Sequence, residues 1–428
     1  MKLKSKFKVK LCAMATATTV LLSACASGYA AAQPQSMPIA AYSAPIVATS
    51  DISTEPADTW TAISDFSQEL FRQALAAEDV DCENIVISPL SAYYALAMVA
   101  LGAGGRTLEE FAYVLGQEPS TLAPELAELA TSLMDVSGST LLTVAGSVWI
   151  RDDFTIHPEF DQMMVDYFGA PAFPRSFDQS TVDEINSWIS YQTNELIEEA
   201  IEEINDEDMM YLINTLYLLT KWAEEFYPMT ESVRSFTPES GVAQDTDFIS
   251  TGTVALNVSV TDAYEAVLLP YDDGRLGFFM VRPTDGTLIR DFANTHYLAD
   301  IFTGLQRHVD VVVHMPELDK EFEITMNYML NAMGLREAFS SGADLFGLVE
   351  YVSGGWLEIS TVRQMARVIV DKEGTEAAAA TVVEVANWSM PAPPLVLDFN
   401  TPYIYAIYDL ETGIPLFIGI LDYPNTSE

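Results

Sequence analysis

The side chains of this 428-residue chain that most often carry nucleophilic or metal chemistry are four histidines and three cysteines. No two histidines stand at a spacing that would place both on one helix face, and no cysteine pair has metal-ligand spacing. The chain also lacks a Gly-x-Ser-x-Gly elbow, a Walker loop and a dinucleotide fingerprint. His314 lies in an apolar run that predicts a strand, where we expect it to be packed. We therefore predict no catalytic residue, no cofactor and no metal site, and an enzyme has no positive support.

Cys25 is the cysteine for which the sequence suggests a chemical role. Residues 1–24 begin with alternating lysines and continue with an apolar stretch, Leu11 to Leu22, that is too short to span a bilayer permanently. The stretch ends in Leu22-Ser23-Ala24-Cys25, which resembles the bacterial lipoprotein cleavage box, in which the thiol accepts a diacylglycerol and becomes the new N-terminus. We expect a signal peptide over 1–24 and lipidation at Cys25. The alternative is an ordinary secretory signal cleaved after Ala30-Ala31-Ala32.

The segment behind Cys25 predicts how the protein is held at the membrane. Residues 25–57 are rich in Ala, Ser, Pro and Thr without sustained periodicity, which is typical of a flexible tether. We expect an exported protein, anchored by lipid to the membrane at the bacterial cell surface or in the periplasm. Cys12 would leave with the signal, so Cys82 would remain alone and no disulfide could form within the mature domain.

The charge balance excludes several classes of partner. The chain has 62 acidic and 20 basic residues, and its formal net charge is −42. Such a surface repels nucleic acid and anionic lipid headgroups, so we expect neither as a partner. Solubility is the simplest reason for the acidity, because the acidic residues are spread along the whole chain. A basic partner is the alternative.

The apolar patterning predicts one large α+β domain over residues 58–424, followed by a short tail, 425–428. Predicted helices are concentrated early and predicted strands late, without the strict alternation of a parallel βαβ array. The predicted helices cover residues 58–77, 92–101, 107–115, 158–168, 182–203 and 326–333. The predicted strands cover residues 84–87, 141–150, 209–219, 266–269, 276–281, 309–315, 367–370, 395–399, 403–408 and 416–421.

Several segments, in order from about residue 58 to Pro424, resemble the serpin family. They include Asn84 to Ser91, Asn186-x-Trp188 with Thr193, Asn214 to Tyr217 followed by Lys221-Trp222, Leu269-Pro270-Tyr271, Ala343-Asp344-Leu345, and a hinge that begins at Gly374-Thr375-Glu376. The resemblance implies the serpin fold, with a central mixed β-sheet, additional sheets, about eight or nine helices and an exposed reactive loop at 372–394. It also implies a region that controls opening of the sheet, formed by Ser88, Ser91, Asn214, Trp222, Glu317 and Lys372.

Some positions depart from the family pattern. Gly146 stands where an Asn is usual, and Gln364 stands where many animal serpins have His. The family typically has Lys where this chain has Glu317, and Glu where it has Lys372. We therefore expect an ion pair at the top of the sheet with its partners exchanged.

The resemblance implies a suicide inhibitor, which traps a protease as an acyl-enzyme when the cleaved loop inserts into the central sheet. A segment that enters a sheet must donate its backbone N–H groups, and no proline lies between Lys372 and Met390. Its leading side chains are small, since Thr375 and Glu376 are followed by Ala377, Ala378, Ala379 and Ala380. Alternation gives one set for burial (Thr375, Ala377, Ala379, Thr381, Val383 and Val385) and a second set, with both glutamates, that we expect to face water.

The bait bond is less closely defined than the hinge. A count of fourteen residues from Thr375 reaches Trp388, which predicts cleavage between Trp388 and Ser389 by a chymotrypsin-like protease. Asn387 and Met390 are alternative positions, although Pro391 would hinder cleavage after Met390. We expect a monomer that forms a covalent complex with its target, which could also be a cysteine protease. The functional alternative is a non-inhibitory serpin that acts as a surface binding or carrier protein.

Overall fold

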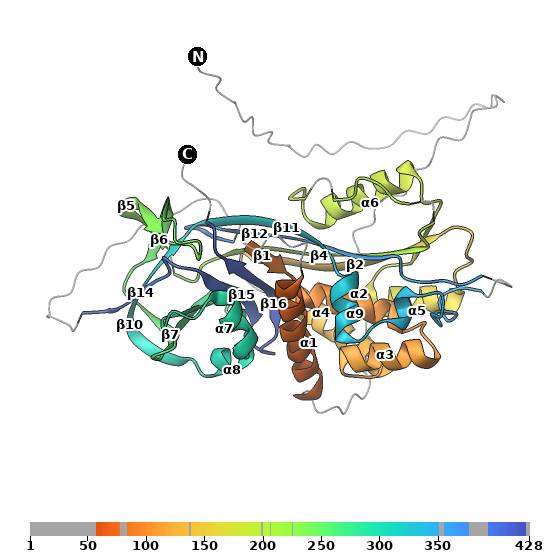
Figure 1. The fold of residues 1–428 in the computed structure, drawn as a ribbon, viewed down its shortest axis with the longest axis horizontal. Helices are drawn as coiled ribbons and strands as arrows, with labels where there is room; N and C mark the ends of the chain where they lie inside the picture. Colours follow the sequence, from red (N-terminus) through yellow and green to blue (C-terminus); the bar gives the residue numbers. More distant parts are fainter. Residues whose placement is uncertain are drawn as a thin grey trace, which may run out of the picture. The chain divides into compact units, whose positions relative to one another are not determined.

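Two β-sheets and nine α-helices make up the part of the chain that the structure describes. The computed structural model describes residues 57–77, 84–136, 138–197, 200–205, 207–224, 226–350, 355–375 and 393–424. Its mixture of helices and sheets confirms the predicted α+β class and the predicted number of helices (Figure 1).

The smaller sheet has six strands in the order β11-β12-β13-β4-β2-β3, and we call it the central sheet. It is mixed as predicted, because β12 runs parallel to β4 and β2 runs parallel to β3, while the other neighbours are antiparallel. Its strands are β2 (Leu141–Arg151), β3 (Phe173–Arg175), β4 (Met210–Lys221), β11 (Leu318–Thr325), β12 (Thr361–Val370) and β13 (Gly374–Thr375).

The larger sheet has ten strands, in the order β1-β16-β15-β9-β8-β7-β10-β6-β5, with β14 paired to β10 beside this path. β14 is held in parallel to β10, from Val311 opposite Leu395 to His314 opposite Asp398. The strands are β1 (Asn84–Ile87), β5 (Phe226–Phe236), β6 (Gln244–Thr251), β7 (Val254–Val260), β8 (Tyr264–Pro270), β9 (Leu276–Pro283), β10 (Gln306–Pro316), β14 (Leu395–Asp398), β15 (Tyr403–Asp409) and β16 (Pro415–Leu421).

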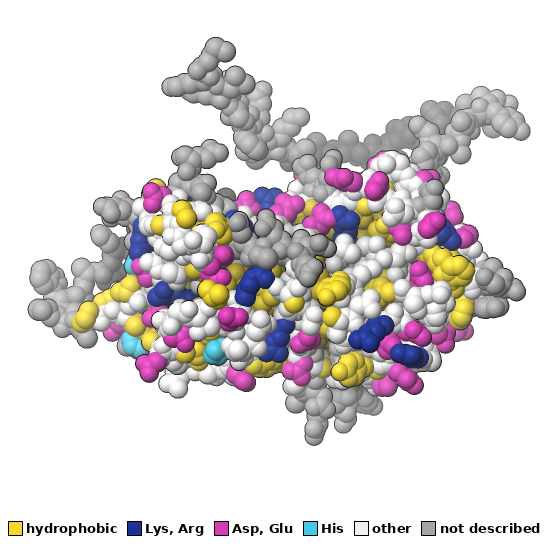
Figure 2. Space-filling view, in the orientation of Figure 1, with side chains coloured by type: hydrophobic (Ala, Val, Ile, Leu, Met, Phe, Trp, Pro, Cys, Tyr) yellow, Lys and Arg dark blue, Asp and Glu magenta, His cyan; other side chains and the backbone are white. Residues whose placement is uncertain are grey.

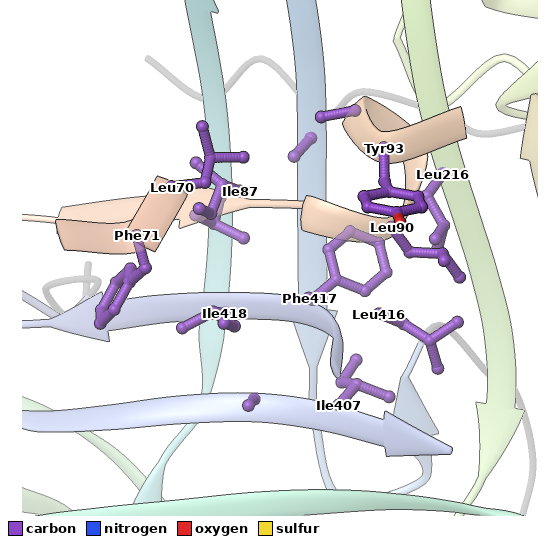
Figure 3. Close-up of a cluster of buried hydrophobic side chains, with 14 of the residues drawn as sticks. Leu70, Phe71, Ile87, Leu90, Tyr93, Leu216, Ile407, Leu416, Phe417 and Ile418 are labelled. Carbon is purple, nitrogen blue, oxygen red and sulfur yellow. The ribbon is translucent and has the colours of Figure 1, made fainter. Parts of the chain in front are cut away.

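Helix α2 (Pro89–Ala100) lies in the core, and every one of its residues is buried. A helix that is apolar all round needs such surroundings, because it has no polar face to turn to water. It begins three residues before the predicted start at residue 92, because the Ser88 hydroxyl accepts a hydrogen bond from the Ser91 N–H and Pro89 fits the first turn. In Figure 3 the side chains of Leu90 and Tyr93 meet Phe417 of β16 and Leu216 of β4. α2 therefore connects the two sheets.

The central sheet is covered on both faces. Helix α6 (Gln179–Gln192) lies on one face, where Trp188 and Ile189 form a second, smaller core with Ile213 and Met365 (Figure 1). The opposite face packs on the main core with α2. The other helices are α1 (Ala57–Ala76), α3 (Gly105–Leu115), α4 (Pro119–Met134), α5 (Pro158–Phe168), α7 (Ile289–Thr295), α8 (Leu298–Thr303) and α9 (Asn327–Met333).

Most predicted elements are confirmed, and the predicted helix at 182–203 is wrong at its C-terminal end. α6 ends at Gln192, because Asn194 and Glu195 take left-handed backbone angles (φ 52° and 64°) that a helix cannot continue. The Thr193 hydroxyl accepts the Ile197 N–H at 3.2 Å and holds the turn. The helices α4, α7 and α8 and the strands β3, β5, β6, β7 and β11 were not predicted, and neither was β13, whose residues Gly374–Thr375 are buried although the exposed loop was expected to begin at residue 372. Within the described residues, no helix is long and apolar enough to cross a membrane.

Candidate functional site at the split of the central sheet

The middle of the central sheet is split. β12 and β4 pair directly from Thr361 opposite Tyr211 to Met365 opposite Thr215, and beyond that point they separate. β13 fills the far end of the gap, where Thr375 pairs with Val370 on one side and with Thr220 on the other. β13 is antiparallel to both neighbours, so its own direction from Gly374 to Thr375 leads from the mouth of the gap toward the point where β12 and β4 pair. Among the described residues, β13 alone lies between β12 and β4 in this gap, at its mouth.

A buried polar network joins β12, β4 and the start of α2 just below the split. Gln364 and Asn214 are the second-last directly paired residues, and neither side chain is exposed. The Gln364 amide Nε2 lies 2.6 Å from the Asn214 Oδ1, 2.8 Å from the Ser91 Oγ and 2.7 Å from the Ser88 carbonyl. Its Oε1 accepts the Ser88 N–H at 2.8 Å, and the Ser91 hydroxyl donates to Asn214 Oδ1 at 2.8 Å.

This network, which we call the Gln364 lock, holds the two strands together in the present form. An amide nitrogen has only two hydrogens for the three acceptors around it, so the contacts are shared rather than all made at once. Buried polar groups of this kind are costly to leave without partners. Separation of β12 from β4 would therefore have to break the Gln364 lock.

The hinge residue Thr375 lies at the mouth of the gap in a polar site formed with Tyr271 and Trp222, which we call the hinge seat. Its hydroxyl lies 2.7 Å from the hydroxyl of Tyr271, which is itself buried and stacks on Trp222 with ring centroids 4.8 Å apart. Burial raises the pKa of Tyr271, so this phenol keeps its proton. The Trp222 indole N–H donates to the Asp371 carbonyl at 2.8 Å, which fixes the turn before the hinge.

Gly374 is required by the close approach of β4. Its φ is +151°, and a Cβ added there would lie 2.1 Å from the Thr220 carbonyl oxygen. No side chain fits at that distance, and L-residues rarely adopt that backbone angle. The Asp371 carboxylate accepts the backbone N–H groups of Glu373 and Gly374 at 2.7 and 3.2 Å. The turn from β12 into β13 is thus built into the sequence Asp371–Thr375.

Carboxylates gather beside this turn. The pKa of Glu317 is raised, first by burial and then by the charges of Asp371 and Asp247, while Lys372 acts against the rise. The pKa of Asp371 is raised mainly by burial as well, although its backbone hydrogen bonds oppose the shift. Both shifts favour the protonated acid in the folded protein.

The expected ion pair between Glu317 and Lys372 is wrong in its strict form. Among the described residues, the two groups are not within the 4.0 Å of an ion pair, although Lys372 lies near enough to lower the pKa of Glu317. The reason is the turn: Asp371 points its carboxylate inward to bind the backbone, and Lys372 is left exposed.

The structure brings most of the predicted sheet-opening residues together. Ser88, Ser91 and Asn214 belong to the Gln364 lock, and Trp222 and Gly374–Thr375 to the hinge seat. His314 lies in β10 as expected and is partly buried, which lowers its pKa. The other predicted residues lie outside the described part of the chain: Glu376, Ala377, Ala378, Ala379, Ala380, Asn387, Trp388, Ser389, Met390 and Cys25.

Sequence reasoning missed two parts of the site. Gln364 was noted only as a departure from a pattern, yet it is the residue that every other member of the lock contacts. Tyr271 and Asp371 were not singled out for a role, yet both hold the hinge. The signal in the sequence was the departure at Gln364 itself, which stands where many animal serpins have His.

Gly146, the other departure, has a packing explanation. It lies opposite Asn214 on β2, and a Cβ there would come within 2.7 Å of the terminal methyl of Met98. The side chain of Met98, which belongs to α2, occupies the space that an Asn at position 146 would need. Among the described residues there is no group of three or more His, Cys, Asp or Glu side chains that could hold a metal ion.

Comparison of the sequence with known proteins identifies relatives of this chain. A family model described as "Serpin (serine protease inhibitor)" matches residues 61–424. A putative serpin-Z5 from Oryza sativa subsp. japonica is 31% identical over 382 residues, which are 80% of this chain and 86% of that protein. Neuroserpin from Homo sapiens is 26% identical over 383 residues, with 85% and 92% covered.

Solved structures agree with the sequence matches. The native state of tengpin, a thermophilic serpin, superposes with a TM-score of 0.77 at 29% identity, over 88% of this chain and 96% of tengpin. Human thyroxine-binding globulin in complex with its ligand gives a TM-score of 0.77 at 21% identity, over 87% of this chain and 100% of that one. The second likeness concerns the fold alone.

Proposed function

The chain belongs to the serpin family, and from this membership we propose that it traps a target protease by inserting its cleaved loop into the split of the central sheet. The family consists mostly of protease inhibitors and also contains carriers such as thyroxine-binding globulin. Membership alone therefore leaves the activity open. The proposal rests on the split itself, on the seated hinge and on the register that the hinge imposes.

The register is the observation that carries the proposal. β13 pairs Thr375 with Val370 and with Thr220, and the direct pairing of β12 with β4 sets Gln364 opposite Asn214. These two pairings are consistent, since 370 − 220 and 364 − 214 both equal 150. A strand that continues from Thr375 can therefore bond to both neighbours without any slip. It would bring Thr381 between Gln364 and Asn214, and Val385 opposite Met210 at the start of β4.

The faces of the site match the side chains that would enter it. Thr375 shares the inner face with Val370, and β12 turns Val362, Ala366 and Val368 toward the same main core. Every second residue after Thr375 would join that face, which is the set predicted for burial. Thr381 would bring a hydroxyl to the place where the Gln364 lock now stands, so the polar groups separated there would meet a polar partner.

The outer set of side chains has more varied surroundings than sequence alone suggests. Leu219 and Ile369, which would flank Glu376, are only partly buried, so a charged residue fits there. Farther down, the outer face is covered by α6, and Met365 and Ile213 belong to the second core. Ala380 and Val382 would reach this level. The expectation that the whole outer set faces water is therefore replaced by one in which Glu376 does and the residues level with the second core do not.

The driving force is adequate for the proposed reaction. A strand that enters between two others gains hydrogen bonds on both sides, each worth about 0.5–1.5 kcal/mol net. About ten inserted residues, with burial of the inner side chains, give on the order of 10 kcal/mol or more. Distortion of a bound protease requires a free energy of that order. Trp388 supports a target with a deep apolar specificity pocket, and a cysteine protease is the second candidate.

The proposal is tested with a panel of chymotrypsin-like, subtilisin-like, trypsin-like and cysteine proteases, followed by denaturing electrophoresis and mass spectrometry. We expect a covalent complex with a cut within Asn387–Met390 and a large gain in heat resistance. Thr375→Arg is the matched control, because a large cation cannot occupy the seat beside Tyr271, and this variant should be cleaved without forming a complex. Cleavage of the unaltered protein without a complex or a gain in heat resistance would refute inhibition and favour the carrier function.

We also propose that the protein is exported and anchored by a lipid on Cys25. The proposal rests on the residues Leu22 to Cys25 and on the apolar stretch before them. Expressed in a bacterium with its signal, the unaltered protein should fractionate with membranes and incorporate labelled fatty acid. Cys25→Ala should remove both properties. Membrane association that survives this substitution would refute lipidation.

A further inference from the structure

A pocket on the helical side of the molecule lies away from the split sheet. It has a volume of about 650 Å³ and is open to solvent, and it is formed by α1, the C-terminal end of α3, the turn into α4 and the end of α9. Pockets of 300–1,000 Å³ are the usual size for small organic ligands. None of its lining residues contributes to the Gln364 lock or to the hinge seat.

The base and one wall of this pocket are apolar. Phe66 of α1 and Val114 of α3 are buried at 3% and 8% exposure, and Met333 of α9 lies beside them. Tyr113 contributes an aromatic wall with 77% of its surface exposed. A ligand in the pocket can therefore cover apolar surface and the face of an aromatic ring.

The rim is acidic. Asp65, Glu69 and Glu118 contribute carboxylates, and no Lys, Arg or His is found among the described residues that line the pocket. Arg72, which is not among the lining residues, forms an ion pair with Glu69 at 4.0 Å and neutralises part of this charge, so the rim keeps an excess of acidic charge. Asp65 is held in place by the Tyr297 hydroxyl, which donates to it at 2.6 Å. Burial and the Asp65 charge raise the pKa of Tyr297, so this donor keeps its proton.

The pocket is held open by a close helix contact. α3 ends at Gly116, whose φ of +72° reverses the chain, and a Cβ at this glycine would lie 3.0 Å from the Cβ of Ala62 on α1. The backbone of the turn therefore rests directly on α1 and fixes the width of the pocket. The next residue, Gln117, donates to the Thr59 hydroxyl at 2.9 Å, which ties the turn to α1 a second time. A preformed pocket loses little entropy on binding.

We propose that this pocket binds an organic ammonium ion that carries an apolar group. The ammonium would be attracted by the three carboxylates and by the face of Tyr113, while the apolar group covers Phe66, Val114 and Met333. An anionic ligand is excluded by the rim. A neutral apolar ligand would gain nothing from the excess of acidic charge on the rim, and an inorganic cation would leave the apolar base uncovered.

Calorimetric titration of the full-length protein with 4-phenylbutylamine tests the proposal. 4-Phenylbutan-1-ol is the neutral counterpart of this probe, and 1,4-diaminobutane is the cation without an apolar group. We expect saturable binding of 4-phenylbutylamine at one site, and affinities at least tenfold lower for the other two. Equal affinity of the alcohol, or no binding of the amine, would overturn the proposal.

Matched variants locate the site and separate it from general attraction by an acidic protein. Figure 2 shows that acidic side chains are scattered over the visible face rather than gathered in one patch, so a charge-matched control is needed. Glu69→Gln with Glu118→Gln should weaken binding about 3- to 20-fold, and Tyr113→Ala about 2- to 5-fold. Glu128→Gln with Glu159→Gln removes the same charge from exposed positions outside the pocket and should change the affinity less than twofold. If this control weakens binding as much as the pocket variant, the amine is held by net charge and the proposal fails.

Discussion

The Gln364 lock can be tested by Gln364→Met, which keeps the length of the side chain and removes its polar atoms. The Ser88 N–H then loses the acceptor that now lies 2.8 Å away, whereas the Ser91 hydroxyl keeps its bond to Asn214. One orphaned buried donor costs about 1–3 kcal/mol, and each net hydrogen bond lost adds about 0.5–1.5 kcal/mol. We therefore expect a loss of about 2–5 kcal/mol in the native form.

The cleaved, inserted form should lose less stability from the same substitution. An inserted strand would separate β12 from β4 by two strand spacings, about 9.6 Å, in place of one. The 2.6 Å contact between Gln364 and Asn214 cannot exist in that form. The substitution therefore favours insertion. In the Gln364→Met variant the uncleaved loop should insert spontaneously faster than in the unsubstituted protein, and the variant should lose its inhibitory activity on storage.

The assay is thermal unfolding of the native and the protease-cleaved protein, together with the half-life of inhibition at 37 °C. We expect the native Tm to fall by about 4–10 °C and the cleaved Tm to fall by clearly less. Thr215→Val is the matched control, because Thr215 is next to Asn214, is fully buried and has a hydroxyl that finds no hydrogen-bond partner among the described residues. Its Tm should change little. Equal losses in the native and cleaved forms would refute the role of Gln364 in keeping the sheet closed.

Three further predictions concern the hinge seat. Gly374→Ala should displace β13 from the sheet, because the new methyl would clash with the Thr220 carbonyl, and hydrogen exchange should show faster exchange at Thr375 with the rest of the fold protected. Tyr271→Phe should lower the free energy of unfolding of the native form by about 0.5–1.5 kcal/mol. In a double-mutant cycle with Thr375→Val the two losses should not be additive. Additive losses would mean that the 2.7 Å contact between the two hydroxyls contributes nothing. The pKa of Glu317 is higher in the folded protein than in the unfolded chain, so the ionised carboxylate lowers the free energy of unfolding at a pH above the folded-state pKa. This stability is recovered as the pH falls from the folded-state pKa to the lower pKa of the unfolded chain. Glu317→Gln should therefore raise the Tm more at pH 8 than at pH 5, and an equal change at both would contradict the shift.

Much of the fold could be predicted from local sequence. β1 and α5 begin and end at the predicted residues, because Ser88-Pro89 follows the short apolar run Ile85–Ile87 in one case and Pro158 with a terminal Gly169 marks the ends in the other. α7 and α8 have only seven and six residues, too few to show helical periodicity. The edge strand β5 and its neighbour β6 carry many polar residues, so their pairing partners rather than their composition make them strands.

The candidate site divides in a similar way. A Pro-free segment with small leading residues could be read directly, since it reflects what any strand entering a sheet requires. Whether Glu317 and Lys372 form an ion pair could not be predicted from the sequence. Whether two charges meet depends on the turn at Asp371, and this turn directs one carboxylate inward and leaves Lys372 in water.

The sequence by itself determined the family, the α+β architecture and the hinge at Gly374-Thr375, because these depend on residue types in a fixed order. Only the tertiary structure decided that β12 and β4 part after Met365 and Thr215, and that Gln364 closes the sheet below this point. Gln364 lies 150 residues from Asn214 and 276 from Ser88 in the chain. Contacts over such separations are set by how strands and helices pack together, and no local pattern records them. The same holds for the register at Thr375, which two neighbouring strands fix jointly.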